Sequence, residues 1–163
     1  MNGLIQLNRN LIGQAQTLVS GLPWSTYARK CEPVFSSSIG QHLRHCIEHY
    51  EEFFAAHADA RDIDYEARPR DAALEEDVVL AQTRLVAIEE SFVFLPEKPS
   101  PIGIRDTGAS VPAASSLDRE LQYLISHTVH HFAIISVIAK HFGVSVPTEF
   151  GIAPSTLKHR ATA

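Results

Sequence analysis

Apolar residues recur three and four positions apart in four separate segments of this chain, and this spacing limits its fold more than any other feature. Such spacing gathers apolar side chains on one face of an α-helix, whereas a half-buried strand alternates apolar and polar residues. The four sets are Leu4, Leu11, Ala15 and Leu18; Ile39, Leu43, Cys46, Tyr50 and Phe53; Leu74, Val78, Ala81, Leu85, Ile88 and Phe92; and Leu121, Leu124, Ile125, Val129, Phe132, Ile135 and Ile138. The sequence therefore predicts an all-α chain of four amphipathic helices that pack as a bundle.

Capping residues and helix breakers predict where these four helices begin and end. Ser38 and Gln41 have the spacing of a capping box, in which each side chain bonds the backbone N–H of the other. The residues expected at the starts of the first, second and fourth helices are Asn2, Ser38 and Ser115. The residues expected at or just beyond the helix ends are Gly21, His57, Pro96 and Gly143.

Two long connectors separate the predicted helices. Residues 58–71 are charged and contain Pro69, which predicts a crossover between the second and third helices and not a tight turn. Residues 95–114 are rich in proline, and a short hairpin is expected around Ile102 to Arg105. We expect residues 1–143 to form the domain and residues 144–163 to pack on it partly as extended chain before fraying.

Length and composition favour one domain. The chain has 163 residues, of which 45% are hydrophobic and 20% charged, an ordinary globular balance. Its formal net charge of -5 disfavours nucleic acid and anionic membranes as partners. The run from Phe132 to Ala139 is far shorter than the ~20 apolar residues that cross a bilayer. Two cysteines, Cys31 and Cys46, are too few for a disulfide scaffold, so we expect a soluble cytoplasmic protein.

Histidines are concentrated in two of the predicted helices. Of the nine in the chain, three lie within residues 42–49 and three within residues 127–131. His127 and His131 are four residues apart, so their imidazoles lie on one helix face and can share one divalent ion. His130 points about 100° away from His131, so we expect it to pack, to orient the ligands or to face the substrate.

Helix geometry does not decide which histidine of the second helix completes this site. At about 100° per residue, His42 and His49 lie at the edge of the apolar stripe, while His45 lies about 130° from its centre. That geometry favours His42 or His49. A ligand of an open site belongs at the rim of a groove, however, so His45 is a third candidate.

The segment Ser38-Ile39-Gly40-Gln41-His42-Leu43-Arg44-His45 resembles the second-helix signature of the DinB-like (DinB/YfiT) superfamily of metal-dependent enzymes, with a metal-binding histidine seven residues after the Ser/Thr-Ile start. The segment from His127 to His131 resembles the fourth-helix His-x-x-x-His segment of that family. The resemblance implies that His45, His127 and His131 are the metal ligands. It also implies a four-helix bundle of up-down-down-up topology, with the long crossover between the second and third helices.

The same resemblance leaves the substrate open. Where many members follow the histidine pair with Arg-Gly-Gln, this chain has Phe132-Ala133-Ile134, so substrate and dimer contacts do not carry over. Characterised members include S-transferases and a maleylpyruvate isomerase that use low-molecular-weight thiols. The resemblance thus implies a divalent metal, with a low-molecular-weight thiol as a candidate second cofactor, and a homodimer is a candidate assembly.

A three-histidine site with an open position predicts a metal-dependent enzyme. Zn, Ni, Fe or Mn would lower the pKa of bound water or thiol, as a hydrolase or an S-transferase acting on a small-molecule substrate requires. His42, His49 and His130 are candidate helpers that orient ligands or move protons. The alternatives are a non-catalytic, stress-associated bundle in which metal only staples the helices, and a metal-free bundle that binds a small molecule.

Other polar residues near these segments have two interpretations each. Arg68 and Arg70 in the crossover can bind the carboxylate of a cofactor or substrate, or they can make surface ion pairs. Glu48 and Glu51 can accept hydrogen bonds from the imidazoles, or they can be exposed helix residues, which is the commoner situation. Cys46 lies in the middle of the apolar stripe, so we expect a buried, inert thiol.

Overall fold

The computed structural model describes residues 3–96, 101–105 and 108–162, and the described chain is mostly helical. The predicted cap Asn2 lies outside these residues. The elements are α1 (Gly3–Ser20), α2 (Trp24–Tyr27), α3 (Ile39–Ala58), α4 (Ala73–Glu76), α5 (Val78–Ser91), η1 (Phe92–Phe94), β1 (Ile102–Ile104), β2 (Ala113–Ser115), α6 (Leu117–His141) and α7 (Pro154–Thr162). The prediction of an all-α fold is confirmed, with one small two-stranded sheet added.

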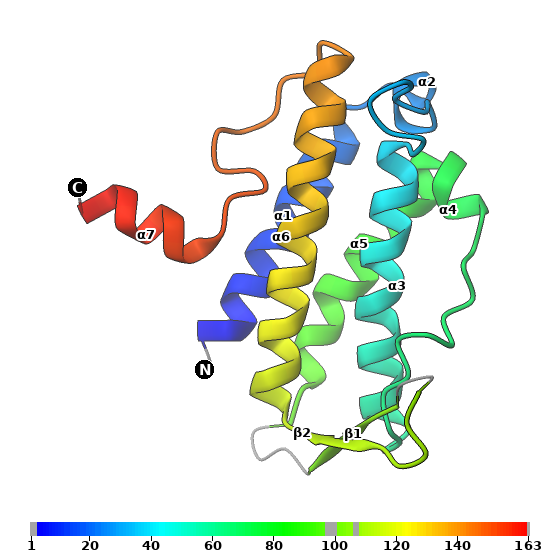
Figure 1. Cartoon of the computed structure of the whole chain (residues 1–163), viewed down its shortest axis with the longest axis vertical. Coiled ribbons are helices and arrows are strands. Elements are labelled where there is room, and N and C mark those ends of the chain that lie inside the picture. Colours follow the sequence, from blue (N-terminus) through cyan, green and yellow to red (C-terminus); the bar gives the residue numbers. More distant parts are fainter. Residues whose placement is uncertain (1–2, 97–100, 106–107, 163) are drawn as a thin grey trace.

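The four long helices, α1, α3, α5 and α6, lie side by side (Figure 1). α3 packs against α5 and α6, and α1 packs against the same two helices. α1 and α6 run in one direction, while α3 and α5 run in the other (Figure 1). The connector after α3 returns along the outside of the molecule to α4, as a crossover must when two consecutive helices run the same way (Figure 1).

The start of α3 forms as its sequence predicts. The Ser38 side chain accepts a hydrogen bond from the Gln41 N–H, and the Gln41 side chain accepts one from the Ser38 N–H, each at 3.1 Å. The start of α6 differs by one residue from the prediction. Ser116 and not Ser115 is the N-cap, because Ser115 is the last residue of β2 and pairs with Ile102.

The predicted third helix is broken near its start. Asp77 has an extended backbone, and its carboxylate accepts hydrogen bonds from the N–H groups of Val79 and Leu80. An aspartate that caps a new helix in this way cannot also continue the preceding one. The chain therefore forms the short α4 and then α5, which ends in the 3-10 turn η1 before Pro96, as expected.

A chain of buried hydrogen bonds joins three helices inside the core. Tyr50 donates to the Asn8 Oδ1 at 2.7 Å, and Thr128 donates to the Tyr50 hydroxyl at 3.4 Å. The Asn8 amide donates in turn to the carbonyl of Leu121 at 3.1 Å. These contacts fix α1, α3 and α6 relative to one another, and α3 and α6 are the two helices that carry the histidine clusters.

The hairpin expected in the second connector is present, and it covers one end of the helices. β1 and β2 are antiparallel, with Ile102 opposite Ser115 and Ile104 opposite Ala113. Ile63 in the crossover makes a parallel bridge with Ile104. The hairpin thus connects the crossover to the first turn of α6.

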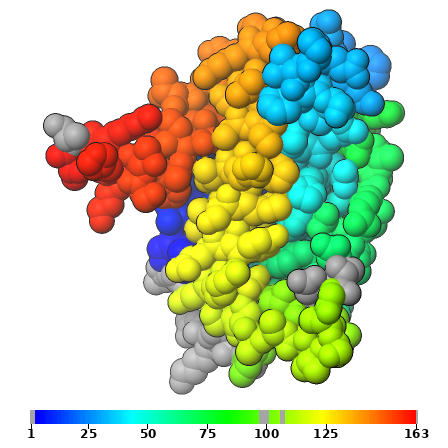
Figure 2. Space-filling view, viewed as in Figure 1, coloured from blue at the N-terminus to red at the C-terminus, as the bar shows by residue number. Residues whose placement is uncertain are grey.

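The C-terminal segment contacts α6 and then forms a helix, where the sequence predicts extended chain. Phe150 stacks on Phe132 with ring centroids 4.4 Å apart, and Gly151 has a φ of +74° where the chain lies against the backbone of Ala133. Beyond this contact, Pro154–Thr162 forms α7 and not extended chain. Proline suits the first position of a helix because it has no N–H to satisfy there. α7 has no buried residue and projects from the rest of the molecule (Figure 2).

α6 is long and apolar enough to cross a membrane by length and composition, with a mean hydropathy of 1.2. This corrects the expectation drawn from its short uninterrupted apolar run. The helix lies between α1 and α3 and carries three of the clustered histidines, and its buried apolar residues belong to the protein core. Core helices of soluble proteins commonly combine such length and hydropathy.

Candidate metal centre

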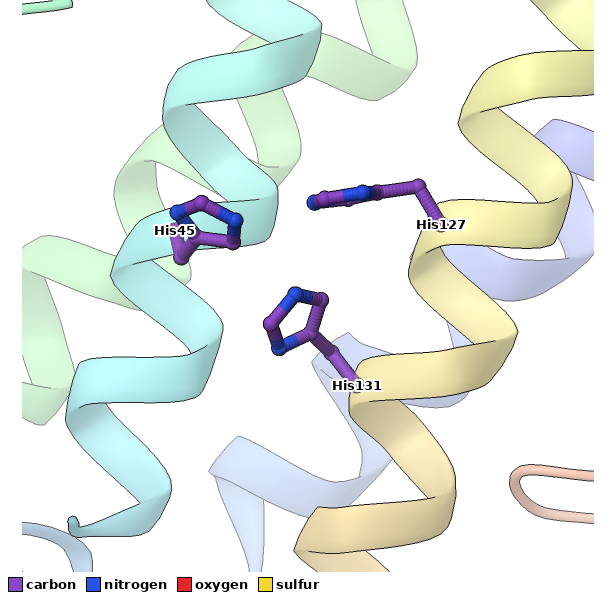
Figure 3. A group of neighbouring side chains, drawn as sticks. All are labelled: His45, His127 and His131. Carbon is purple, nitrogen blue, oxygen red and sulfur yellow. The ribbon is translucent and has the colours of Figure 1, made fainter.

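Three histidines from α3 and α6 converge in the interface between these helices (Figure 3). His45, His127 and His131 each direct one ring nitrogen to a common point, and these nitrogens lie within 4.8 Å of one another. Nitrogens bound to one tetrahedral ion at about 2.1 Å are about 3.4 Å apart, so small side-chain rotations complete the geometry. The structure thus brings together the three residues that the family resemblance implies.

The environment of His127 fits a metal ligand. Its Nε2 atom is buried and has no hydrogen-bond partner. A buried polar atom without a partner is costly, and native structures rarely leave one unsatisfied. A divalent ion held with His45 and His131 would use this nitrogen, so the donor set suits a metal.

His42 lies outside the group of three and hydrogen-bonds one of its members. Its Nδ1 lies 2.9 Å from the Nδ1 of His131, and its Nε2 lies 2.8 Å from the hydroxyl of Ser37. The Nδ1 of His131 is therefore occupied, which leaves Nε2 to face an ion. Ligand histidines usually have such a partner on the second nitrogen, and it fixes the orientation of the ring.

His49 forms a wall of the same cluster. Its Nδ1–H donates to the carbonyl of His45 at 2.7 Å, so its Nε2 carries the lone pair. The ring is 2% exposed and lies between Tyr65 and His127, with centroid distances of 5.2 and 4.1 Å. His42 and His49, which helix geometry alone favours as ligands, are thus both engaged in hydrogen bonds next to His45 and His131.

The other histidines are peripheral. His130 is exposed and contacts the ring of His131 at 5.2 Å, in agreement with a place outside the group of three. His141 and His159 are exposed. His57 is half-buried, with its ring 4.4 Å from that of Phe53.

Arg68 reaches the cluster from the crossover. Its side chain is 8% exposed, and its guanidinium nitrogens lie 3.2 Å from the Nδ1 of His45 and 3.2 Å from the Nε2 of His49. The interpretation of Arg68 as a surface ion-pair residue is therefore wrong. Arg70 is exposed, with a φ of +53°. Arg68 and Arg70, for which the sequence allows the same two interpretations, therefore have different environments.

Glu48 is buried, contrary to the expectation of an exposed helix residue. It is 1% exposed and accepts hydrogen bonds from Arg44 at 3.1 Å and from the N–H of Asp71 at 2.6 Å. The Nε of Arg68 lies 3.8 Å from the same carboxylate. Glu48 thus fixes the crossover on α3 and does not bond an imidazole. Glu51 pairs with Arg84 instead of with a histidine.

Burial keeps the clustered imidazoles neutral. It lowers the pKa of His45 to about 2, with further lowering from neighbouring His49, and it lowers that of His127 to about 4. The same cause lowers the pKa of His49 to about 3 and that of His131 to about 3. The pKa of His42 is lowered as well. Neutral imidazole is the form that binds metal, so the site needs no deprotonation step near pH 7.

A pocket of about 330 Å³ lies next to the cluster, between the hairpin, the crossover and the first turns of α6. Tyr65 and Tyr123 line it, and their rings contact His49 at 5.2 Å and His127 at 5.4 Å. Buried Glu120 accepts a hydrogen bond from Tyr65 at 3.0 Å. Tyr123 was missed by sequence reasoning, although its position four residues before His127 places both on one helix face.

The cysteines take no part in the cluster. Cys31 and Cys46 are both buried and free. Burial raises the pKa of the Cys46 thiol. A thiol that stays protonated is a poor nucleophile, and the predicted burial of Cys46 is confirmed.

No known family model matches this chain, and no solved structure matches it. The chain is similar to FK506-binding protein 5 of Rhizopus delemar, with 36% identity over 109 residues. The match covers 60% of this chain and 27% of that protein. The chain therefore spans only about a quarter of this relative.

Proposed function

We propose that this chain is a metal-dependent enzyme in which His45, His127 and His131 hold one divalent ion. The observation that carries the proposal is the convergence of three neutral imidazoles, one with a buried and unpartnered nitrogen. Zinc, nickel, iron and manganese are the candidate ions, because imidazole accepts each of them. Three protein ligands leave a coordination position for water or a low-molecular-weight thiol.

The bound ion would supply a nucleophile by lowering the pKa of that water or thiol toward neutrality. The remaining tasks belong to the protein. His42 holds the ring of His131 through the 2.9 Å contact, and His49 limits the space beside His127. The pocket lined by Tyr65 and Tyr123 gives a small-molecule substrate room next to the cluster. The reaction type is a hydrolysis or the transfer of a group to a thiol.

The proposed fold is the four-helix bundle of the DinB-like superfamily, with up-down-down-up topology. The directions of the four long helices and the long crossover after α3 support this assignment (Figure 1). Two histidine segments on adjacent helices support it as well. The proposed location is the cytoplasm, supported by two buried free cysteines. FK506 binding, the property in the name of the Rhizopus delemar protein, is not part of the proposal, because the proposal rests on the histidine cluster.

The competing proposal is a bundle in which metal only staples α3 to α6. Such a site would use a fourth protein ligand, since structural zinc sites are closed. The best-placed candidates are His42 and His49, but both ring nitrogens of each already have a hydrogen-bond partner. This arrangement favours the open, catalytic site. A metal-free bundle that binds a small molecule would not depend on His127.

Cobalt substitution tests the open site. Co(II) bound by three histidines and solvent gives visible absorption bands, and 2-mercaptoethanol should add an intense thiolate-to-cobalt band in the near ultraviolet. The double variant His127→Ala/His131→Ala should show neither signal, whereas His141→Ala should behave as the native protein. Visible bands that do not respond to the thiol would instead support a closed, structural site.

A further inference from the structure

The guanidinium of Arg68 uses the lone pairs of two histidines as its acceptors. Its terminal nitrogens lie 3.2 Å from the Nδ1 of His45 and 3.2 Å from the Nε2 of His49. A guanidinium only donates hydrogen bonds, so both ring nitrogens must be unprotonated. For His49 this agrees with the donation of Nδ1–H to the carbonyl of His45. His45 must then carry its hydrogen on Nε2.

This arrangement conflicts with metal binding by His45. If the ion takes the lone pair on Nδ1, the guanidinium loses that acceptor. If the hydrogen moves so that Nε2 binds the ion, an N–H group of His45 faces an N–H group of Arg68. In both cases a buried guanidinium nitrogen is left without an acceptor, which costs more for a charged group than for a neutral one.

Among the described residues around Arg68, the ion-pair partner Glu48 is a poor replacement acceptor. The Nε atom of Arg68 is already buried without a hydrogen-bond partner, and the carboxylate of Glu48 lies 3.8 Å away. That carboxylate is committed to Arg44 and to the N–H of Asp71. Another N–H of Arg68 is committed to the carbonyl of Tyr65.

The charges lead to the same conclusion. The imidazoles of the cluster are neutral, and Glu48 already faces two arginines, Arg44 and Arg68. A divalent ion would therefore add two positive charges to a site without a carboxylate ligand. We infer that Arg68 is an anion-binding residue, which holds an oxyanion group, a carboxylate or a phosphate, on the ligand that occupies the metal centre.

The inference rests on the proposed metal site and adds the substrate class to it. A planar guanidinium matches the two oxygens of a carboxylate or a phosphate, and such contacts are charge-assisted. A neutral substrate would leave unpaired the guanidinium nitrogen that His45 releases. The centre should therefore select anionic molecules over neutral molecules of the same shape.

Anion titration of the cobalt-loaded protein tests this inference. Acetate and inorganic phosphate are the two probes, acetamide is the neutral control for acetate, and the shift of the visible cobalt bands is the readout. We expect acetate, phosphate or both to bind, and acetamide not to. Arg68→Gln should lower the affinity for the anion that binds by about tenfold or more, which is the usual effect of losing a hydrogen bond to a charged group. The relative effect on acetate and phosphate identifies which oxyanion the site prefers.

Two further variants control for charge and folding. Arg70→Gln removes the same charge from an exposed position two residues away and should leave both affinities unchanged. Arg68→Lys keeps a cation beside Glu48, so the variant should fold. It lacks the bidentate geometry of a guanidinium, so its affinity for anions should be several-fold lower than that of the native protein. Native anion affinity in the Arg68 variants, or an equal loss in Arg70→Gln, would overturn the inference while leaving the metal site intact. A protein that binds no cobalt would overturn both.

Discussion

The Nδ1 atoms of His42 and His131 lie 2.9 Å apart across the interface of α3 and α6. One of the two atoms must carry a hydrogen and the other a lone pair. The contact therefore couples the tautomers of the two rings, and binding of an ion by the Nε2 of His131 requires that its Nδ1 carries the hydrogen. Ser37 holds His42 from the other side at 2.8 Å.

Replacing His42 should weaken metal binding without abolishing it. His42→Ala removes the partner of His131, and losses of this kind typically reduce metal affinity by about 10- to 100-fold. Affinity can be measured by competition with a chromophoric chelator. His130→Ala is the matched control, because His130 is exposed and lies outside the group of three, with its ring centroid 5.2 Å from that of His131. Equal affinity in the two variants would show that His42 does not position the ligand.

The stability of the metal-free protein should fall as the pH falls from 7 to 5. Burial lowers the pKa of His127 to about 4, whereas the unfolded chain titrates near 6.5. Between these values the unfolded state binds more protons, so the free energy of unfolding decreases with decreasing pH. The same sign applies to His45, His49 and His131.

Thermal melts in the presence of a chelator check this pH dependence. The midpoint should be highest above pH 7 and should drop steadily toward pH 5, a range above the ordinary pKa of carboxylates. His127→Gln removes one titrating group and should make the decline shallower. A midpoint that is constant over this range would show that the imidazoles are not held in their neutral form.

Replacing Gly40 and Gly13 by alanine should change the free energy of unfolding in opposite directions. A Cβ added at Gly40 would lie 2.1 Å from the carbonyl oxygen of Glu75, so the start of α3 must separate from α4. Such crowding typically costs about 1–3 kcal/mol. A Cβ at Gly13 meets no atom within 4 Å in the middle of α1, so Gly13→Ala should stabilise by about 0.5–1 kcal/mol. Denaturant unfolding of the two variants measures both values, and destabilisation of equal size in both would contradict this packing.

The long helices follow from the sequence because their apolar spacing is regular and because packing of that stripe supplies most helical stability. The capping box at Ser38 formed as predicted, since it depends only on residues three apart. The break at Asp77 was not predicted. A stripe from Leu74 to Phe92 is equally compatible with one helix, and only the cap on Val79 and Leu80 decides against it.

The convergence of the histidines was less accessible to sequence reasoning. A helical wheel gives angles within one helix, but the rotation of α3 relative to α6 depends on packing across the whole interface. Hence the wheel favours His42 or His49, while the family resemblance implies His45, the histidine that lies with His127 and His131. The burial of Arg68 and Glu48 depends on the path of the crossover, which contacts α3 through residues far apart in the chain.

The metal content of the untagged protein, purified without chelator and measured by elemental mass spectrometry, tests the central claim most directly. The account predicts about one divalent ion per chain in the native protein and a large loss in His127→Ala/His131→Ala. The exposed pair His141→Ala/His159→Ala should retain the native content. A native protein that holds no metal, even after loading with zinc, nickel, iron or manganese, would contradict the account.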